Sequence, residues 1–341
     1  MWMLEQIHPG QGQFNLGFAV RLRRPFDLDR FGVALEEVVA RHPALRTRIG
    51  LDKGEPSQFV GPEATVDLTR RAMPRATDDE LRSAADEFVA RPFELGSGPL
   101  ARFLVLLRAD DDVVLVISIH HIVSDLWSLA VLGREVAEAY VPSAVEPRRA
   151  AHQRSFESFV ADELAHLDSP AGRHSLAFWR EHLDDAPAPI DLAPLLPPSP
   201  GGASARHRRL VPPETVDVCR RLAEAHGASL HDVVLAGYYA LLRRYTGESD
   251  LVVGTYRANR TPRDVQTIGC FRNALAWRVR VDGSAGFGAL LEQVGAVATA
   301  SRPHQRVPLQ VVLDELRSSG QDVDGLLTAT FQWHKTSRVV D

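Results

Sequence analysis

A stretch rich in proline and glycine divides this chain of 341 residues into two parts. Residues 186–205 contain six prolines and two glycines, a composition unsuited to a helix interior or a central strand. A chain of this length is also near the practical limit of a single hydrophobic core. The sequence therefore predicts two lobes, residues 1–185 and 207–341, joined by a linker at residues 186–206.

The first part mixes strand and helix patterns. Residues 100–107 and 113–119 are apolar, β-branched runs separated by a polar segment, which predicts a hairpin of buried strands. Helical spacing of apolar residues predicts helices on either side of this hairpin. These helices are expected at residues 27–42, 78–89, 126–140, 156–167 and 175–183.

The second part repeats this mixture. Strands are predicted at residues 251–255 and within 268–281, with a final apolar-polar alternation at 327–334. Helices are predicted at residues 214–226, 231–245, 284–300 and 308–316. Strands and helices in both parts predict an α/β fold class, with helices packed on a sheet in each lobe.

Charge and composition exclude several classes of protein. Thirty-nine Lys and Arg against forty-four Asp and Glu give a net charge of −5, which argues against nucleic-acid or membrane partners. No export signal or membrane span is visible, and two cysteines fit a cytoplasmic location. Only Lys53 and Lys335 are lysines, which leaves little room for Schiff-base or Walker-type chemistry.

Two adjacent histidines, His120 and His121, lie where the second strand of the predicted hairpin ends. Loops at the carboxyl ends of strands commonly carry reacting groups in α/β proteins. Because side chains alternate along a strand, one histidine is expected to face a cleft and the other the packed interior. The alternation disfavours a shared metal ion, and no third ligand is near in the sequence. The alternative interpretation is that both histidines are structural.

Asp125 allows two interpretations. It directly precedes the helix predicted at residues 126–140, where it fits an N-cap. It also fits a buried ion pair that fixes the loop, and such a carboxylate needs a partner, preferably an arginine. Ser124 lacks the Gly-x-Ser-x-Gly setting of an activated nucleophile and is expected to be a loop residue.

These residues resemble a known family. The segment from His120 to Asp125, followed by Trp127-Ser128, is similar to the His-His-x-x-x-Asp-Gly-Trp-Ser signature of condensation domains of nonribosomal peptide synthetases. Other blocks fall in the family's order along essentially the whole chain. They are residues 2–6, 41–48, 245–247, 251–255, 268–273 and 304–308.

The resemblance implies two chloramphenicol-acetyltransferase-like lobes, each of helices on a sheet, in a V-shaped pseudodimer with a central channel. It implies an acyltransferase: the amine of an acceptor aminoacyl thioester attacks a donor acyl or peptidyl thioester and forms an amide. Both substrates arrive on phosphopantetheine arms of carrier protein domains, so no directly bound cofactor and no metal are expected. Neighbouring adenylation and carrier modules of one synthetase, in secondary metabolite or antibiotic biosynthesis, are the implied partners.

The family pattern also implies roles for the motif. His121, His120 and Asp125 are expected to be the catalytic residues, with His121 facing the channel and His120 packed behind it. A free α-amino group has a pKa of about 7.7 to 8.0, so part of it is already neutral near pH 7. His121 is therefore expected to hydrogen-bond the amine and steady the tetrahedral intermediate, with full proton abstraction as an alternative.

Further roles follow from the same resemblance. Asp125 is expected to form a structural ion pair with Arg278, with Arg257 and Arg260 as alternatives. Four residues are expected to line the channel: Leu126, Trp127, Ser128 and Asn273.

The chain departs from the family pattern in three ways. Leu126 stands where the family has glycine, which predicts a narrower acceptor side or another substrate. The chain also begins at Met1-Trp2 and stops at Asp341, before the last strands of the family's second lobe. The second lobe is thus expected to be incomplete, and the chain to be a fragment of a longer synthetase.

The histidine motif leaves other functions open. Within the same superfamily the alternatives are an ester-forming, an epimerising or an acyl-coenzyme A-dependent enzyme. A different class of function is a non-catalytic platform that docks carrier proteins or tailoring enzymes.

Overall fold

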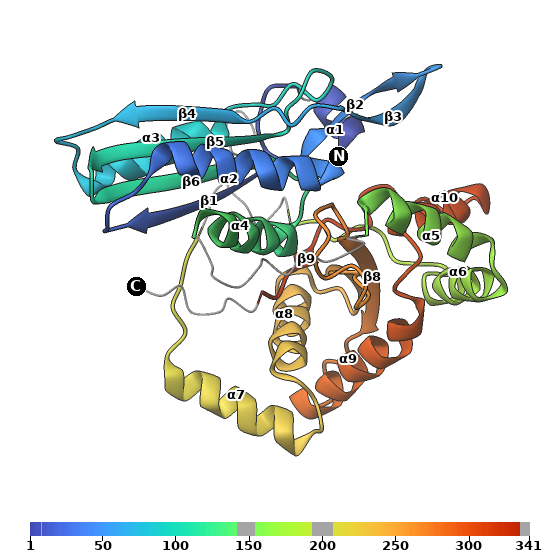
Figure 1. Ribbon diagram of the computed structural model, residues 1–341. Coiled ribbons are helices and arrows are strands. Elements are labelled where there is room, and N and C mark those ends of the chain that lie inside the picture. The colour runs from blue at the N-terminus through green and yellow to red at the C-terminus, as the bar shows by residue number, and fades with distance from the viewer. Residues whose placement is uncertain (8, 142–153, 193–206, 335–341) are drawn as a thin grey trace. The chain divides into compact units, whose positions relative to one another are not determined.

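The computed structural model describes residues 1–7, 9–141, 154–192 and 207–334, which form two compact units (Figure 1). Unit 1 contains Met1–Asp162 and Arg260–Phe271, and unit 2 contains Glu163–Asn259 and Arg272–Asp341. Each unit has a sheet and a hydrophobic core of its own. Among the described helices, none has both the length and the apolar character needed to cross a bilayer.

The sheet of unit 1 has four strands in the order β1-β6-β5-β4. β5 (Ala101–Ala109) and β6 (Asp112–His120) pair antiparallel, which confirms the predicted hairpin. β1 (Asn15–Leu22) pairs antiparallel with β6, and β4 (Asp67–Ala72) pairs parallel with β5. The hairpin takes the two central positions, where its long apolar runs are buried.

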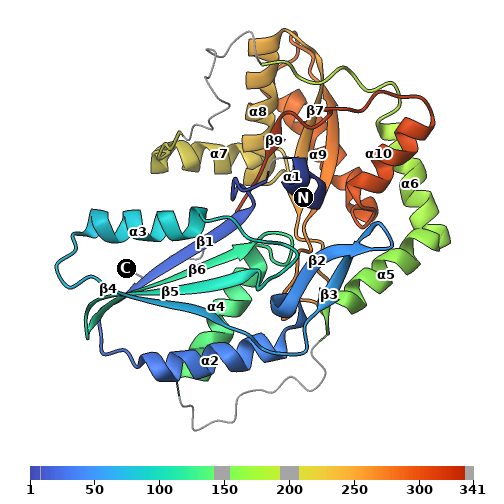
Figure 2. The ribbon, with the colours of Figure 1, turned by 90° about the horizontal axis from the view of Figure 1, so that it is seen from above.

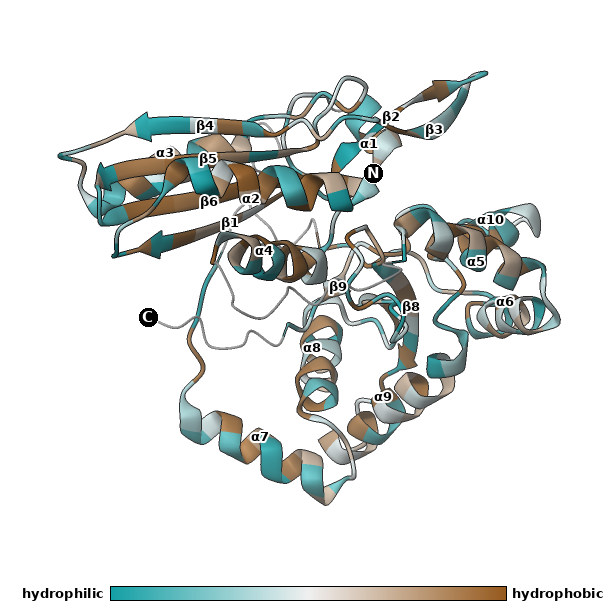
Figure 3. Cartoon of the chain, in the orientation of Figure 1, coloured by the Kyte–Doolittle hydropathy of each residue, from teal (hydrophilic) through white to brown (hydrophobic). Residues whose placement is uncertain are grey.

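Helices cover both faces of this sheet (Figure 2). α2 (Leu28–Arg41) and α4 (Leu126–Tyr140) pack on the face that carries Phe103. α3 (Asp78–Ala90) packs on the opposite face, against Leu104. Successive side chains of β5 point to opposite faces, so a continuous apolar run supplies both layers. Figure 3 shows the hydrophobic residues concentrated on the central strands.

Four strands of unit 1 lack the sequence pattern that predicts strands. β1 has no buried residue, and most residues of β4 are exposed, because both strands lie at the edges of the sheet. β2 (Thr47–Asp52) and β3 (Glu55–Val60) form a separate two-stranded sheet, and β3 has no buried residue. Without a buried face, β1, β3 and β4 have no reason to alternate apolar and polar residues, and β2 buries only Thr47 and Ile49.

The other helices agree in position with the sequence pattern apart from their ends, except α1 (Trp2–Ile7), where no helix was predicted. α6 (Pro170–His182) begins five residues before the predicted helix, since Ser169 caps it and Pro170 occupies its first turn. α8 (Leu230–Thr246) ends at Gly247, whose positive φ of 77° is the expected left-handed end. The remaining helices are α5 (Phe156–Asp168), α7 (Pro213–Ala225), α9 (Phe287–Ser301) and α10 (Leu309–Ser318).

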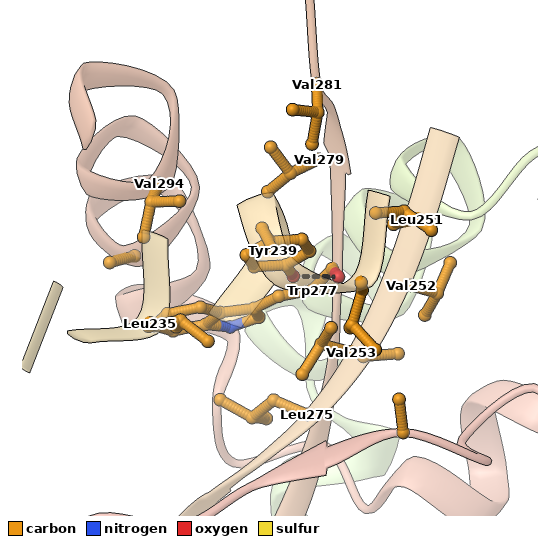
Figure 4. Close-up of a cluster of buried hydrophobic side chains, with 14 of the residues drawn as sticks. Leu235, Tyr239, Leu251, Val252, Val253, Leu275, Trp277, Val279, Val281 and Val294 are labelled. Carbon is orange, nitrogen blue, oxygen red and sulfur yellow. Dashed lines mark hydrogen bonds between the residues drawn. The ribbon is translucent and has the colours of Figure 1, made fainter. Parts of the chain in front are cut away.

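The sheet of unit 2 has the order β8-β7-β9. β7 (Asp250–Arg257) pairs antiparallel with β8 (Asn273–Arg280) and parallel with the short β9 (Thr330–Phe331). Their apolar residues form a core with α8 and α9, shown in Figure 4. Within it the Tyr239 hydroxyl donates to the carbonyl of Trp277 over 2.6 Å, and both side chains are fully buried.

The boundary between the units differs from the predicted lobes, residues 1–185 and 207–341. Trp179 and Leu183 lie in the core of unit 2, so α6 belongs to that unit rather than to the first lobe. Residues 260–271, between β7 and β8, belong to unit 1. Residues 193–206 of the predicted linker lie outside the described residues.

Candidate active site

The histidine motif occupies the loop between β6 and α4. β6 ends at His120, and Asp125 is the N-cap of α4, where its Oδ1 accepts the backbone N–H of Ser128 over 2.7 Å. The backbone N–H of His121 donates to the carbonyl of Phe14 over 2.8 Å. The end of a buried strand and the start of a capped helix therefore hold this short loop at both ends.

His120 lies in the packed interior. Its ring is 1% exposed and has edge-on contacts with Phe14 and Phe93. Its Nδ1 accepts the backbone N–H of Ile122 over 3.1 Å, so the proton of the neutral ring is on Nε2, which donates to Glu5 over 3.3 Å. Burial lowers the pKa of His120, and Glu5 opposes this in part. His120 is thus a neutral residue with one hydrogen bond at each ring nitrogen.

His121 has the opposite tautomer. Its Nδ1 lies 2.7 Å from the backbone carbonyl oxygen of Ser124. A carbonyl oxygen can only accept, so Nδ1 carries the proton. Nε2 of the neutral ring then holds the lone pair, as a general base or hydrogen-bond acceptor requires. The side chain of Ser124 is fully buried in the loop, and its backbone carbonyl orients the imidazole.

Asp125 is both an N-cap and a member of a buried ion pair, so both interpretations of this residue hold. Its Oδ1 accepts from Nη2 of Arg260 over 2.9 Å, and its Oδ2 accepts the backbone N–H of Phe271 over 3.2 Å. The side chains of Asp125 and Arg260 are 7% and 3% exposed. Arg260 was an alternative partner in the sequence analysis, and it is the observed one.

The predicted Asp125–Arg278 ion pair is wrong. Arg278 lies on β8 in unit 2, where its Nη2 is 2.7 Å from Oδ2 of Asp250 on the neighbouring strand. Its guanidinium also donates to the backbone carbonyls of Asp184 and Asp185. Arg278 is therefore already paired with the carboxylate of Asp250 on the neighbouring strand.

Ser128 was expected to line a channel, but it is fully buried. Its hydroxyl donates to the carbonyl of Gly269 over 2.8 Å and accepts from the N–H of the same residue over 3.1 Å. It also accepts from Nη2 of Arg260 over 2.7 Å. The residue fastens the 260–271 segment to α4, because a hydroxyl can donate and accept at once.

Asn273 likewise departs from the expectation of a channel-lining residue. It is 7% exposed at the start of β8, and its amide donates to the backbone carbonyls of Gln305 and Val307. Its side-chain oxygen accepts the N–H of Leu309 over 3.2 Å. These bonds make Asn273 a structural residue of unit 2.

Leu126 and Trp127 are both about half exposed, at 49% and 48%. The indole of Trp127 nevertheless donates to the backbone carbonyl of Val265 over 2.9 Å, which is a further hydrogen bond between α4 and the 260–271 segment. Whether either side chain lines a channel stays a prediction.

Apart from Arg260 as an alternative partner of Asp125, the role of the 260–271 segment in the site was not predicted from the sequence. Gly269 lies so close to the ring of Phe156 that a Cβ would overlap it. Phe271 packs against Phe156 and Phe159, and the guanidinium of Arg260 lies 3.9 Å from the centre of the Phe271 ring. The block at residues 268–273 was a signal, because it is one of the blocks that fall in the family's order along the chain.

The site has few groups for metal binding. Among the residues that the structure describes, no three His, Cys, Asp or Glu side chains gather as metal ligands do. Both cysteines are reduced thiols, and Sγ of Cys270 lies 3.7 Å from Nδ1 of His121.

Comparisons with known proteins agree with these features. A family model described as the condensation domain matches residues 1–337. The chain is 35% identical over 333 residues to phosphinothricin tripeptide synthetase PhsC of Streptomyces viridochromogenes, covering 93% of this chain and 30% of the relative. It is 31% identical over 320 residues to bacitracin synthase 3 of Bacillus licheniformis, covering 93% of this chain and 5% of the relative. The chain thus spans less than a third of the length of these curated relatives.

Solved structures show the same fold. The first condensation domain of the calcium-dependent antibiotic synthetase, in complex with a substrate analogue, matches with a TM-score of 0.74 and 25% identity, over 97% of this chain and 78% of that one. A four-domain nonribosomal peptide synthetase matches with a TM-score of 0.82 and 22% identity, over 99% of this chain and 26% of that one. These similarities confirm the predicted fold class.

Proposed function

We infer the function from the family, because this chain belongs to the condensation domains. The proposed reaction is amide bond formation between a donor acyl or peptidyl thioester and the amine of an acceptor aminoacyl thioester. The new C–N bond replaces the thioester C–S bond, the carrier thiol leaves, and the amine gives up one proton. The activity is that of an acyltransferase.

One observation carries this proposal: the hydrogen bond from Nδ1 of His121 to the carbonyl of Ser124. It leaves Nε2 of the neutral ring as an acceptor for a proton of the attacking amine. Holding both substrates in near-attack geometry can supply roughly 7 to 11 kcal/mol, whereas a general base typically supplies about 10²- to 10⁴-fold in rate. We therefore assign His121 the role of orienting the amine and accepting its proton as the tetrahedral intermediate forms.

The other motif residues act through His121. His120 donates to Glu5 and accepts from the loop backbone, which supports a packing role behind the catalytic ring. Asp125 and Arg260 hold the loop and the 260–271 segment together. We assign these residues positioning roles, since none of them has to contact the reacting atoms.

Carrier proteins are the proposed partners, with donor and acceptor groups delivered on their phosphopantetheine arms. The relatives support this, because they are synthetases far longer than this chain, and one solved relative is a four-domain synthetase. Adenylation and carrier modules acting with this domain are therefore part of the proposal. The chain itself would hold no cofactor.

The test is a condensation assay with carrier proteins loaded with a panel of acyl and aminoacyl donors and acceptors. Products on the acceptor carrier are weighed by mass spectrometry. Amide formation by the native chain should fall about 10²-fold or more in His121→Ala and stay unchanged in His207→Ala, whose histidine is exposed. Full turnover in His121→Ala, with the protein folded, would contradict the role of His121.

The same assay separates the other reactions. An alcohol acceptor that gives product where amines give none would indicate ester formation. Inversion of the donor stereocentre without mass gain would indicate epimerisation. Carrier binding without any product, in the native chain and in His121→Ala alike, would indicate a docking platform.

A further inference from the structure

Cys270 is held against the catalytic loop from both sides. Its predecessor, Gly269, is bonded through its N–H and its carbonyl to the hydroxyl of Ser128. Its successor, Phe271, donates its N–H to Asp125. Ser128 and Asp125 belong to the start of α4, so the backbone of Cys270 is fixed relative to the motif.

The side chain of Cys270 contacts His121 at the nitrogen that sets the tautomer. Sγ lies 3.7 Å from Nδ1 of His121, while the carbonyl oxygen of Ser124 lies 2.7 Å from the same atom. The single N–H at Nδ1 donates mainly to the carbonyl oxygen of Ser124, which is a strong acceptor. The sulfur of Cys270 is a second, weak acceptor for the same hydrogen. Sulfur also fills the space beside the ring, so the imidazole cannot tilt away from Ser124 without losing that contact.

We propose that Cys270 is a positioning residue for His121: through it the 260–271 segment holds the imidazole in its Nδ1–H tautomer and in its catalytic orientation. The part of this inference that concerns catalysis rests on the proposed function. It adds a residue outside the histidine motif, contributed by the segment between β7 and β8. The segment would thus position the catalytic ring as well as its supporting carboxylate.

The geometry argues against a nucleophilic role for this thiol. A base that activates a thiol must present a lone pair to it, and Nδ1 of His121 donates its proton to Ser124 instead. An acyl group on Sγ would also occupy the space beside the ring. Cys270 therefore acts through His121, and its removal should weaken the reaction without abolishing it.

The first test measures the ring tautomer and titration of His121 and needs no assay of activity. Selective ¹⁵N labelling of histidine allows NMR to report the tautomer and titration of each ring, and His121→Gln identifies the His121 signals. In Cys270→Ala we expect a smaller Nδ1–H population and a shifted titration midpoint, with substantial recovery in Cys270→Ser. Cys219→Ala, which removes the other thiol, on α7, should leave the His121 signals unchanged.

The second test measures kcat and KM for amide formation in the same variants. Cys270→Ala should lower kcat about tenfold with little change in KM, because a displacement of about 1 Å at a reacting group can cost about 10²-fold. Where Cys270→Ala fails to fold, reversible methylthiolation of Cys270 in a Cys219→Ser background takes the place of that variant. The modification should change the His121 signals, and dithiothreitol should restore them.

The two readouts separate the possible failures. Unchanged His121 signals in Cys270→Ala, or in the methylthiolated protein, would overturn the proposal whatever the activity. Changed signals together with no amide formation by the native chain would refute the proposed function and leave Cys270 as a residue that positions His121. Covalent acyl transfer to Cys270, seen as an acyl-enzyme by mass spectrometry and lost in Cys270→Ser, would replace the positioning role by a nucleophilic one.

Discussion

Nη2 of Arg260 lies 2.9 Å from Oδ1 of Asp125, although 135 residues separate the two in the sequence. Both side chains are nearly inaccessible to solvent, and Arg260 also donates to the backbone carbonyls of Asp264 and Thr267. Burial lowers the pKa of Arg260, and the charge of Asp125 and its hydrogen bond oppose this lowering. A guanidinium stays charged in proteins, so the two side chains form an ion pair. The pair therefore links the N-cap of α4 to the 260–271 segment.

Asp125→Ala should reduce the free energy of unfolding by about 3 to 5 kcal/mol, since it leaves the Arg260 charge buried without its carboxylate. Urea unfolding followed by tryptophan fluorescence measures this loss. The control is Asp29→Ala, which removes an exposed ion pair with Arg70 and should barely move the midpoint. Equal losses in the two variants would contradict a structural role for the buried pair.

Glu5 should raise the pKa of His120, because its carboxylate faces Nε2 of that ring. Glu5→Gln keeps an acceptor and removes the charge, so the pKa of His120 should fall further below its ordinary value. NMR titration of the His120 ring measures the change. Glu36→Gln, an exposed position on α2, is the matched control and should have no effect.

Glu5→Ala removes the acceptor as well. A buried N–H left without a partner costs about 1 to 3 kcal/mol, so this variant should be less stable than Glu5→Gln by that order. Equal stability of the two variants would show that the hydrogen bond to His120 contributes nothing to folding.

Alanine substitutions at two glycines should change the stability of the protein in opposite directions. Gly269→Ala would drive its Cβ into the ring of Phe156 and should destabilise the protein by about 1 to 3 kcal/mol. Gly133 lies inside α4 with no atom near its potential Cβ, so Gly133→Ala should stabilise by about 0.5 to 1 kcal/mol. Thermal unfolding compares the two.

Phe156→Leu should recover part of the stability lost in Gly269→Ala, because the smaller side chain makes room for the new methyl group. The double variant is compared with each single variant in the same unfolding experiment. Additive losses would show that the two residues do not constrain each other.

Local patterns predicted the centre of the site well. The apolar runs of β5 and β6, the helical spacing of α4 and the cap at Asp125 are each encoded within a few residues, and all were found where expected. β1 was not predictable in this way, because an edge strand without buried residues needs no alternating pattern.

Partners distant in sequence were harder to predict. Arg278 seemed suitable for Asp125, but the antiparallel register puts it opposite Val252, diagonal to Asp250 on the same face. Only that register shows that its charge is already paired. Arg260 lies in a segment without strand or helix pattern, so its packing on unit 1 follows from tertiary contacts that periodicity does not encode.

His182, on α6, makes the stability of unit 2 sensitive to pH. Its Nε2 accepts the backbone N–H of Arg278 over 3.1 Å, and protonation would break this bond next to a guanidinium. Burial, and then the Arg278 charge, lower the pKa of His182 from 6.5 to about 4. Between those values the unfolded chain binds a proton that the folded protein does not, so stability falls as the pH falls.

The effect of His182 should be on the order of 2.5 kcal/mol at pH 4.5, and absent above about pH 7, where the ring is neutral in both states. The free energy of unfolding is measured by urea titration at intervals from pH 4.5 to 7.5. His182→Gln keeps an acceptor for the N–H of Arg278 and should reduce the slope, and the slope that remains comes in part from His120, His166 and His304, whose pKa values burial also lowers. The exposed His207→Gln should retain the native slope. A native slope in His182→Gln would show that this histidine is protonated equally in the folded and unfolded chains, and would assign the acid sensitivity to other residues.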